Sequence, residues 1–192
     1  MKQETMWRRL SKYIKETETK LSLSDRIGYE AQYRTKYKIA AKYKPRSIIE
    51  IGVRAGYSAF AFLAACPNAF YYGIDNNSNE HGGEEDLYLK ALDLLKEYRT
   101  IIQIKDSQNI NSLPPCDFLH VDGDHSYKGC LHDIEIGTRS SKVIVVDDYD
   151  YIEEVRNACD NFKKNNSSYN YSFISDGGFR GNFIIEVGIK WL

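Results

Sequence analysis

The sequence predicts an α/β protein in three layers, built on a mostly parallel seven-stranded sheet. Five short apolar runs are rich in β-branched and aromatic residues, which is typical of strands buried on both faces of a parallel sheet. Segments with helical patterns separate these runs, as parallel strand–helix–strand units require. The last two runs follow each other without a helix, so they predict an antiparallel pair at the end of the sheet.

Each of the first five expected strands leads into a carboxylate. We expect these strands at about 47–51, 70–75, 101–104, 117–121 and 142–146, and the acids that end the runs are Glu50, Asp75, Asp106, Asp122 and Asp147. The final pair is expected at about 170–174 and 182–187. Ligands of open α/β sheets bind outside the carboxyl ends of the strands. Five acids would therefore meet at one rim, which suits hydroxyls, amines and cations and repels phosphate.

Helices are expected between the strands and before the first one. The internal helices are predicted at about 57–65, 86–98, 127–137 and 151–164. Near the N-terminus, Trp7, Leu10, Ile14, Thr17 and Leu21 recur at spacings of three and four, which predicts an amphipathic helix that packs on the domain or on a second subunit. A second helix starts near Ser24 and stops before Pro45. We expect 1–44 to be a helical segment packed on 45–192, within a single domain.

The composition excludes several classes of protein. The chain has 192 residues and a net charge of −1, so no global field favours nucleic acid or an anionic membrane. No apolar stretch approaches the roughly 20 residues of a membrane span. Four cysteines lie far apart, which indicates reduced thiols in the cytoplasm and argues against zinc. A basic segment interleaved with tyrosines predicts a solvated helix face rather than a nucleic-acid contact: Arg34, Lys36, Lys38, Lys42, Lys44 and Arg46.

A glycine-bearing turn follows the first expected strand and predicts a nucleoside-bearing cofactor. Gly52 would allow the sharp turn, and Gly56 would let a ligand approach the next helix. The spacing is neither the dinucleotide fingerprint nor a P-loop. Asp75, one strand–helix–strand unit further on, could accept the hydroxyls of a ribose.

This turn and acid resemble the opening motif of class I S-adenosylmethionine-dependent methyltransferases, over about residues 45–187. The resemblance implies a Rossmann-like methyltransferase fold. It also implies that Glu50, Gly52 and Gly56 hold the methionine part of the cofactor, that Asp75 holds the ribose, and that Asp106 and Ser107 lie beside the adenine. We extend the expected cofactor site to adjacent residues: Tyr57, Ser58, Asn76 and Asp122.

A second acid cluster follows the fourth and fifth expected strands, in Asp122-Gly-Asp124-His125-Ser-Tyr and Asp147-Asp148-Tyr-Asp. Neighbouring strand ends lie about 5 Å apart, and unpaired carboxylates that close would raise each other's pKa values unless a cation sits among them. A hard divalent ion such as Mg²⁺ would meet this need. Each acid, taken alone, could instead cap a helix.

The same residues resemble metal-dependent small-molecule O-methyltransferases, in which Asp122, Asp147 and Asp148 match the three metal ligands. The catechol type has asparagine at the last position, and the doubled aspartate is more similar to the branch that acts on sugar or macrolide hydroxyls. The stretch from Asp122 to Tyr127 is also similar to a broad family of small bacterial methyltransferases.

The resemblance implies that a metal-chelated hydroxyl attacks the sulfonium methyl group after a base removes its proton. His125 and Asp124 compete as that base. His125 is favoured because an ordinary histidine titrates near pH 6.5, whereas an aspartate would need a raised pKa. His125 could instead only cap the following helix.

The predicted activity is therefore O-methylation of a small-molecule hydroxyl, such as one on a sugar, a polyol or a natural product. No nucleic-acid or membrane partner is expected, and a homodimer is compatible with the short chain. Two alternatives stay open. One is a nucleic-acid methyltransferase, although the sequence lacks an Asn/Asp-Pro-Pro-Tyr motif after the fourth strand. The other is a non-catalytic module that only binds S-adenosylmethionine.

Overall fold

The computed structural model describes residues 3–18, 23–78, 86–175 and 180–188. Its strands are β1 (Ser47–Ile51), β2 (Phe70–Asp75), β3 (Arg99–Ile104), β4 (Cys116–Val121), β5 (Ser141–Val146), β6 (Asn170–Ser175) and β7 (Gly181–Glu186). Its α-helices are α1 (Gln3–Thr17), α2 (Leu23–Tyr43), α3 (Tyr57–Ala65), α4 (Leu87–Leu95), α5 (Tyr127–Thr138) and α6 (Glu153–Asn165), with a 3₁₀ turn at Ser107–Asn109. The predicted order of strands and helices is confirmed, and α4 is shorter than expected.

The seven strands form one sheet in the order β3-β2-β1-β4-β5-β7-β6. The first five strands are parallel, and β7 runs antiparallel to both β5 and β6. This confirms the mostly parallel sheet with an antiparallel end. The strand order reverses between β1 and β4, and ligands of such sheets bind at this switch point, outside the carboxyl ends of the strands.

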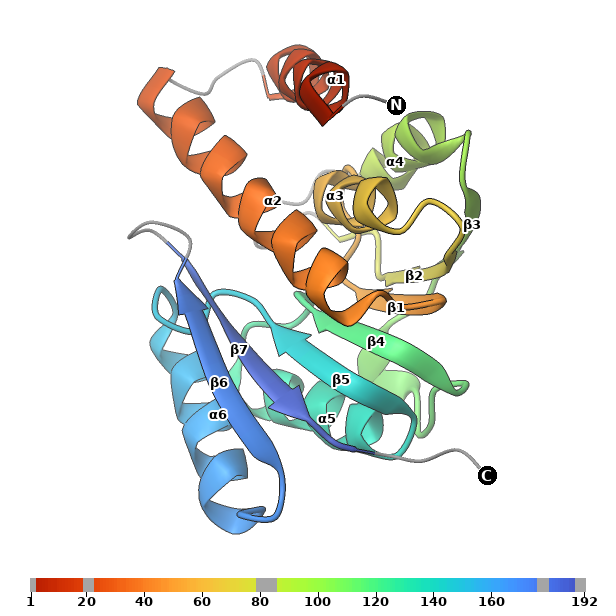
Figure 1. The fold of residues 1–192 in the computed structure, drawn as a ribbon. Coiled ribbons are helices and arrows are strands. Elements are labelled where there is room, and N and C mark those ends of the chain that lie inside the picture. The colour runs from red at the N-terminus through yellow and green to blue at the C-terminus, as the bar shows by residue number, and fades with distance from the viewer. Residues whose placement is uncertain (1–2, 19–22, 79–85, 176–179, 189–192) are drawn as a thin grey trace.

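Two apolar cores cover the two faces of the sheet (Figure 1). One core joins α1, α2, α3 and α4 to strand residues such as Ile48 and Phe118. The other joins α5 and α6 to alternate strand residues such as Ile49 and Leu119. Because strand side chains alternate between faces, the continuous apolar runs supply both cores, as predicted.

Strand β3 departs from the expectation that every early strand is buried on both faces. It pairs only with β2 and forms an edge of the sheet, and Ile101 and Ile104 are about half exposed, at 51% and 43%. An apolar run predicts a strand but carries no information about whether a further strand lies beyond it.

The N-terminal helices pack on the domain. Trp7, Leu10 and Ile14 of α1 are buried in the first core, which confirms these three residues of the predicted stripe. Thr17 is only half-buried, and Leu21 lies outside the described residues. Five of the six residues of the basic segment are exposed, as predicted, although Lys44 and Arg46 lie beyond the end of α2. The prediction is wrong for Lys36, which is fully buried.

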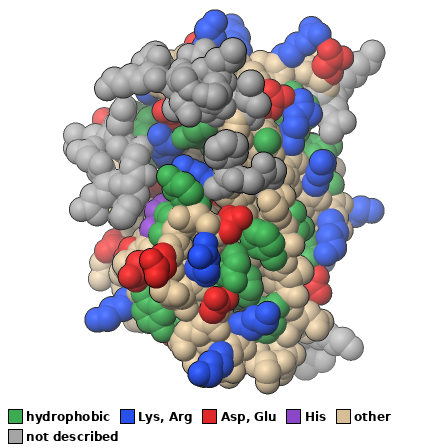
Figure 2. All heavy atoms as spheres, turned by 90° about the vertical axis from the view of Figure 1, so that its left-hand side faces the viewer, with side chains coloured by type: hydrophobic (Ala, Val, Ile, Leu, Met, Phe, Trp, Pro, Cys, Tyr) green, Lys and Arg blue, Asp and Glu red, His purple; other side chains and the backbone are tan. Residues whose placement is uncertain are grey.

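The described surface has no strong charge asymmetry in the view of Figure 2, where acidic and basic side chains are interspersed. This agrees with the net charge of −1. Among the described residues, no helix is long and apolar enough to cross a membrane.

Candidate active site

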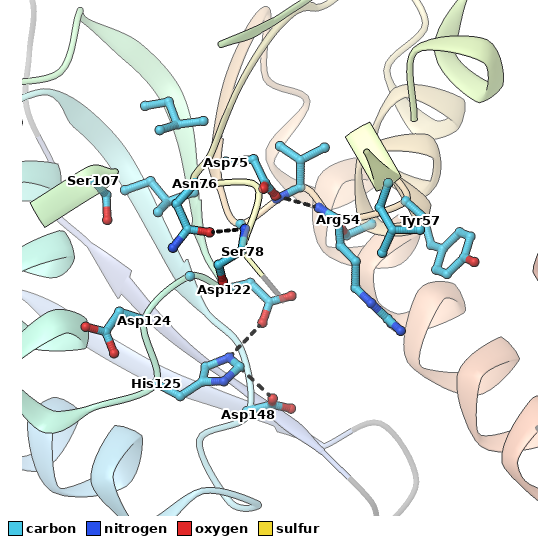
Figure 3. Close-up of a pocket in the computed structure, with 18 of the residues that line it drawn as sticks. Arg54, Tyr57, Asp75, Asn76, Ser78, Ser107, Asp122, Asp124, His125 and Asp148 are labelled. Carbon is cyan, nitrogen blue, oxygen red and sulfur yellow. Dashed lines mark hydrogen bonds and ion pairs between the residues drawn. The ribbon is translucent and has the colours of Figure 1, made fainter. Parts of the chain in front are cut away.

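A cavity of about 340 Å³ opens at the carboxyl ends of the parallel strands (Figure 3). Its walls come from the turn after β1, the ends of β2 and β3, the segments after β4 and β5, and the inner face of α2. Most of the predicted site residues line it: Gly52, Tyr57, Ser58, Asp75, Asn76, Asp106, Ser107, Asp122, Asp124, His125 and Asp148. Glu50, Gly56 and Asp147 do not.

The turn after β1 requires glycine at Gly52 for two reasons. Its φ of 86° lies in the left-handed region, and a Cβ atom there would lie 1.9 Å from the Asp122 carbonyl oxygen. The turn therefore packs directly on the segment after β4. Gly56 also has a positive φ, but a Cβ there would meet Ala91 of α4 at 2.8 Å. Gly56 thus permits close helix packing, where the sequence suggested a close ligand.

Asp75 ends β2 and organises the same turn. Its Oδ2 atom accepts hydrogen bonds from the backbone N–H groups of Val53 and Arg54, both at 2.8 Å, and Figure 3 shows Asp75 beside Arg54. Its Oδ1 atom accepts a hydrogen bond from Asn77 N–H at 2.7 Å. A carboxylate offers about four acceptor positions, so one on Oδ1 is left for a ligand hydroxyl. Asn76 also lines the cavity, and its side-chain oxygen accepts from Ser78 N–H.

Glu50 lies below the cavity in a buried polar network. Its carboxylate accepts hydrogen bonds from the hydroxyls of Ser58 and Tyr71 and contacts His120 Nδ1 at 2.7 Å. His120 is itself fully buried in the core. Glu50 is the penultimate residue of β1, so its side chain faces the core under the turn instead of the rim. It can act on a ligand only through residues such as Ser58, which lines the cavity.

The segment after β3 forms the opposite wall of the cavity. Asp106 caps the 3₁₀ turn by accepting from Gln108 N–H at 2.9 Å. The Ser107 hydroxyl and the Gln108 amide both donate to Asp133, a fully buried residue of α5, at 3.2 Å. Gln108 and Asp133 were not predicted. The predicted Ser107 is thus held in place by a carboxylate from another layer.

His125 lies between two acids at the mouth of the cavity (Figure 3). Its Nε2 atom is 3.3 Å from Asp122 Oδ1 and 3.8 Å from Asp148 Oδ2. Burial alone would lower the pKa of His125, but the hydrogen bond to Asp122 and the charges of the nearby aspartates raise it above 6.5. The pKa of Asp122 is lowered by the same contact, despite burial. The contact with Asp122 therefore favours the protonated form of His125 and the ionised form of Asp122.

Asp148 is held in an unusual conformation. Its φ of 57° is left-handed, which aspartate tolerates better than most residues. Burial, together with the charges of Asp147 and Asp122, raises the pKa of Asp148 to about 7. Arg180 Nη1 lies 3.4 Å from Asp148 Oδ1 and partly offsets these effects.

Asp124, the second candidate base, is turned toward helix α5. Its Oδ1 atom accepts from Ser126 N–H at 2.8 Å, and in Figure 3 its carboxylate points away from the His125 ring. Ser126 itself is the N-cap of α5, accepting from Gly129 N–H at 3.1 Å. The cap is therefore made by Ser126, with Asp124 holding the Ser126 N–H, and not by His125.

Asp147 is paired with a buried lysine. Lys36 Nζ of α2 lies 2.7 Å from Asp147 Oδ2, and both side chains are at most 1% exposed. Gln32, one turn earlier in α2, donates to the same oxygen at 3.1 Å. Burial would lower the pKa of Lys36, but Asp147 and then Asp122 outweigh burial and raise it above 10.5. Lys36 is thus a stable cation inside the acid cluster.

The predicted divalent-metal site can be tested against this geometry. Among the described residues, two groups place ligand atoms within 4.8 Å of one another: His120, Asp122 and Asp147, and Asp122, His125 and Asp148. Neither group contains all three predicted carboxylates. One oxygen of Asp147 is taken by Lys36. The residues present therefore do not fit a metal ion held by Asp122, Asp147 and Asp148 together.

Helix α2 supplies site residues that sequence reasoning missed. Tyr29, Gln32, Tyr33 and Lys36 follow the spacing i, i+3, i+4 and i+7, which places them on one helix face. The first three line the cavity, and Lys36 reaches Asp147 beside it. The spacing was readable from the sequence, but the lysine-rich surroundings of Lys36 favoured a solvated position.

The fold is shared with solved methyltransferase structures. The SAH-bound methyltransferase PaMTH1 of Podospora anserina is 17% identical at a TM-score of 0.68, with 93% of this chain and 87% of that chain covered. The O-methyltransferase TomG of Streptomyces achromogenes, in complex with SAM, is 16% identical at 0.68, with 96% and 90% covered. An O-methyltransferase of Bacillus cereus, in complex with SAH, is 14% identical at 0.65, with 97% and 92% covered. A search of curated proteins finds no match.

The sequence itself matches a family model. The model describes a methyltransferase domain and covers residues 49–149, from β1 through the glycine turn, the His125 segment and Asp148. More than half of the chain is matched, and the match contains the strand ends that form the cavity. This chain therefore belongs to that methyltransferase-domain family.

Proposed function

We propose that this methyltransferase transfers the methyl group of S-adenosylmethionine to a hydroxyl of a small molecule, with His125 as general base. The observation that carries the proposal is the position of His125, held by Asp122 and Asp148 at the edge of the cavity that the glycine turn also lines. The solved O-methyltransferases of similar fold, in complex with SAM or SAH, support the same choice of cofactor and acceptor atom.

The cavity has the features that this cofactor requires. Its volume of about 340 Å³ falls within the range of roughly 300–1,000 Å³ for small-molecule sites. Gly52 leaves the turn backbone close to Asp122, and Asp75 keeps one acceptor position for a ribose hydroxyl. Ser107 and Gln108 offer polar groups at the opposite wall. When bound, S-adenosylmethionine supplies a methyl group on a positively charged sulfur, which the carboxylate of Asp122 would attract.

His125 would accept the proton of the acceptor hydroxyl. As the acceptor oxygen forms its bond to the methyl carbon, the carbon–sulfur bond breaks and its electron pair stays on sulfur. A ring nitrogen of His125 takes the hydroxyl proton, and Asp122 and Asp148 stabilise the imidazolium that results. Holding the two reactants at attack distance would supply much of the remaining rate.

The acceptor side of the cavity favours a small polar molecule. Tyr29 and Tyr33 of α2 cover it with aromatic rings that carry hydroxyls, and Arg180 adds a positive charge beside Asp148. A sugar, a polyol or a hydroxylated natural product would match this mixture. We propose the cytoplasm as the location, supported by four cysteines that are all free thiols.

The test compares methyl transfer to a panel of polyhydroxyl compounds by the wild type, His125→Ala and Asp124→Ala. We expect His125→Ala to lose at least about 100-fold in rate, while Asp124→Ala stays within a few-fold. The wild-type rate should rise with pH through a pKa above 6.5, since His125 must lose its proton first, and this rise should vanish in His125→Ala. Near-normal rates in both variants would exclude both residues as the base.

Two other outcomes would redirect the proposal. Cofactor binding by calorimetry without turnover of any acceptor would favour a non-catalytic binding module. Salt-dependent retention of RNA or DNA on filters, with methylation of that polymer, would favour a nucleic-acid substrate, since most basic residues of the 34–46 segment are exposed. We expect neither result.

A further inference from the structure

Lys36 of α2 is a buried charged residue that lies outside the proposed catalytic group. Its side chain is fully buried, and its ammonium lies 2.7 Å from Asp147 Oδ2. Removing a charge from water is costly unless it is paired at good geometry. Gln32 donates to the same carboxylate oxygen, so two residues one turn apart on α2 both contact Asp147. A surface ion pair would need no such arrangement.

The position of this ammonium is where the sequence predicts a metal ion. Asp147 is the central member of the predicted ligand set, between Asp122 on the neighbouring strand end and Asp148 next in the chain. The charges of all three carboxylates act on Lys36. The positive charge of Lys36 therefore offsets the repulsion among the three carboxylates, which is the role that we expected of a divalent ion.

The count of charges points the same way. Lys36 and Arg180 set two permanent positive charges against the three aspartates. With all three aspartates ionised and His125 neutral, one net negative charge is left, and it matches the single positive charge of a sulfonium. A divalent ion in place of the ammonium would bring the net charge to zero and remove this attraction for the sulfonium.

We infer that the buried ammonium of Lys36 replaces the divalent metal ion in this site, so that the protein holds its acid cluster together without metal. Lys36 acts as a positioning residue: it fixes Asp147, and the neighbouring Asp122 and Asp148 are left to orient His125. The inference rests on the proposed function for its chemistry, but its consequence for metal binding can be measured without any acceptor.

The experiment is a titration of Mn²⁺ followed by electron paramagnetic resonance, on the wild type, Lys36→Met and Lys38→Met. Methionine keeps the length of the chain without the charge, and Lys38 is an exposed residue of the same helix that serves as the matched control. We expect the wild type and Lys38→Met to bind Mn²⁺ no more tightly than about 1 mM, and Lys36→Met to bind at least about tenfold more tightly. The melting temperature of Lys36→Met alone should rise on addition of Mn²⁺.

If Lys36→Met fails to fold, measurements on the wild type alone still test whether Lys36 replaces a metal ion. Stoichiometric Mn²⁺ binding by the wild type at micromolar concentration, or loss of its methyl transfer in excess EDTA with recovery on added Mg²⁺, would overturn the inference. So would equal Mn²⁺ affinities of a folded Lys36→Met and the wild type. Calorimetry of S-adenosylmethionine on the same samples separates the two proposals, because absent cofactor binding would refute the proposed function and leave the Mn²⁺ result standing.

Discussion

Asp133 should make the stability of this protein depend on pH, and the effect can be calculated. The residue is fully buried in α5, where it accepts hydrogen bonds from Ser107 and Gln108. Burial raises the pKa of Asp133 from 3.8 to about 7; the charges of Asp124 and Asp106 add to the rise, and the two hydrogen bonds oppose it. The folded protein therefore keeps a proton on Asp133 that the unfolded chain releases.

The sign and size of the effect follow from this difference. Below about pH 4 the carboxyl group is protonated in both states, and the folded state has its full stability. As the pH rises toward 7 the unfolded chain gives up its proton first, so the free energy of unfolding falls, by about 4 kcal/mol in total at 1.4 kcal/mol per pKa unit. Asp133→Asn carries no proton to release, so this loss should be absent in the variant.

The assay is urea unfolding of the wild type and Asp133→Asn at about pH 5 and about pH 8. Other groups titrate in both proteins, so the informative quantity is the difference between them, which should change by about 3 kcal/mol across this interval in favour of the variant. Asp93→Asn is the control: Asp93 is an exposed acid paired with Lys96, and its replacement should change stability by less than about 0.5 kcal/mol at either pH. An unchanged difference between the wild type and Asp133→Asn would refute the buried, protonated state of Asp133.

Three further substitutions test the cofactor site and the packing of α1. Gly52→Ala should weaken S-adenosylmethionine binding at least about tenfold by calorimetry, because the added Cβ atom would collide with the Asp122 carbonyl. The control is Gly188→Ala, which also lies at positive φ but has open space around it and should leave binding unchanged. Asp75→Asn should lower cofactor affinity by at least about tenfold, since a side-chain amide would replace the carboxylate that now accepts hydrogen bonds from the turn N–H groups. Binding equal to the wild type would exclude Asp75 from the site. Leu10→Ala should lower the free energy of unfolding, measured in urea, by about 2–5 kcal/mol because Leu10 is buried between helices. Lys12 of the same helix is exposed, so Lys12→Ala should have little effect.

The fold was readable from the sequence because its signals are local. Apolar runs such as 143–146 are long enough to be strands and too short to be helices, and the absence of a helix before β7 indicated the antiparallel end. The exposure of β3 was not readable, because an edge position depends on which strands lie beyond it. The place of Glu50 was also missed: the acid precedes the last residue of β1, and that single position sends its side chain into the core.

The candidate site was readable only where its residues follow strands directly. Asp122, His125 and Asp148 come from such positions, and they do meet. Lys36 and Asp133 lie on helices, and their partners are distant in the sequence: Lys36 pairs with a residue 111 positions away. Nothing local distinguishes a lysine that is buried against an aspartate from the solvated lysines beside it.

Helix α2 is the element that distinguishes this site from a bare acidic rim. Without it, Asp122, Asp147 and Asp148 would face solvent at one edge of the sheet, and only a bound cation could hold them together. Its face from Tyr29 to Lys36 covers the cavity and supplies the charge that pairs with Asp147. Under the proposed function the helix lies on the acceptor side of the site, and we expect changes on this face to alter acceptor choice and proton transfer before they alter the cofactor contacts on the opposite wall.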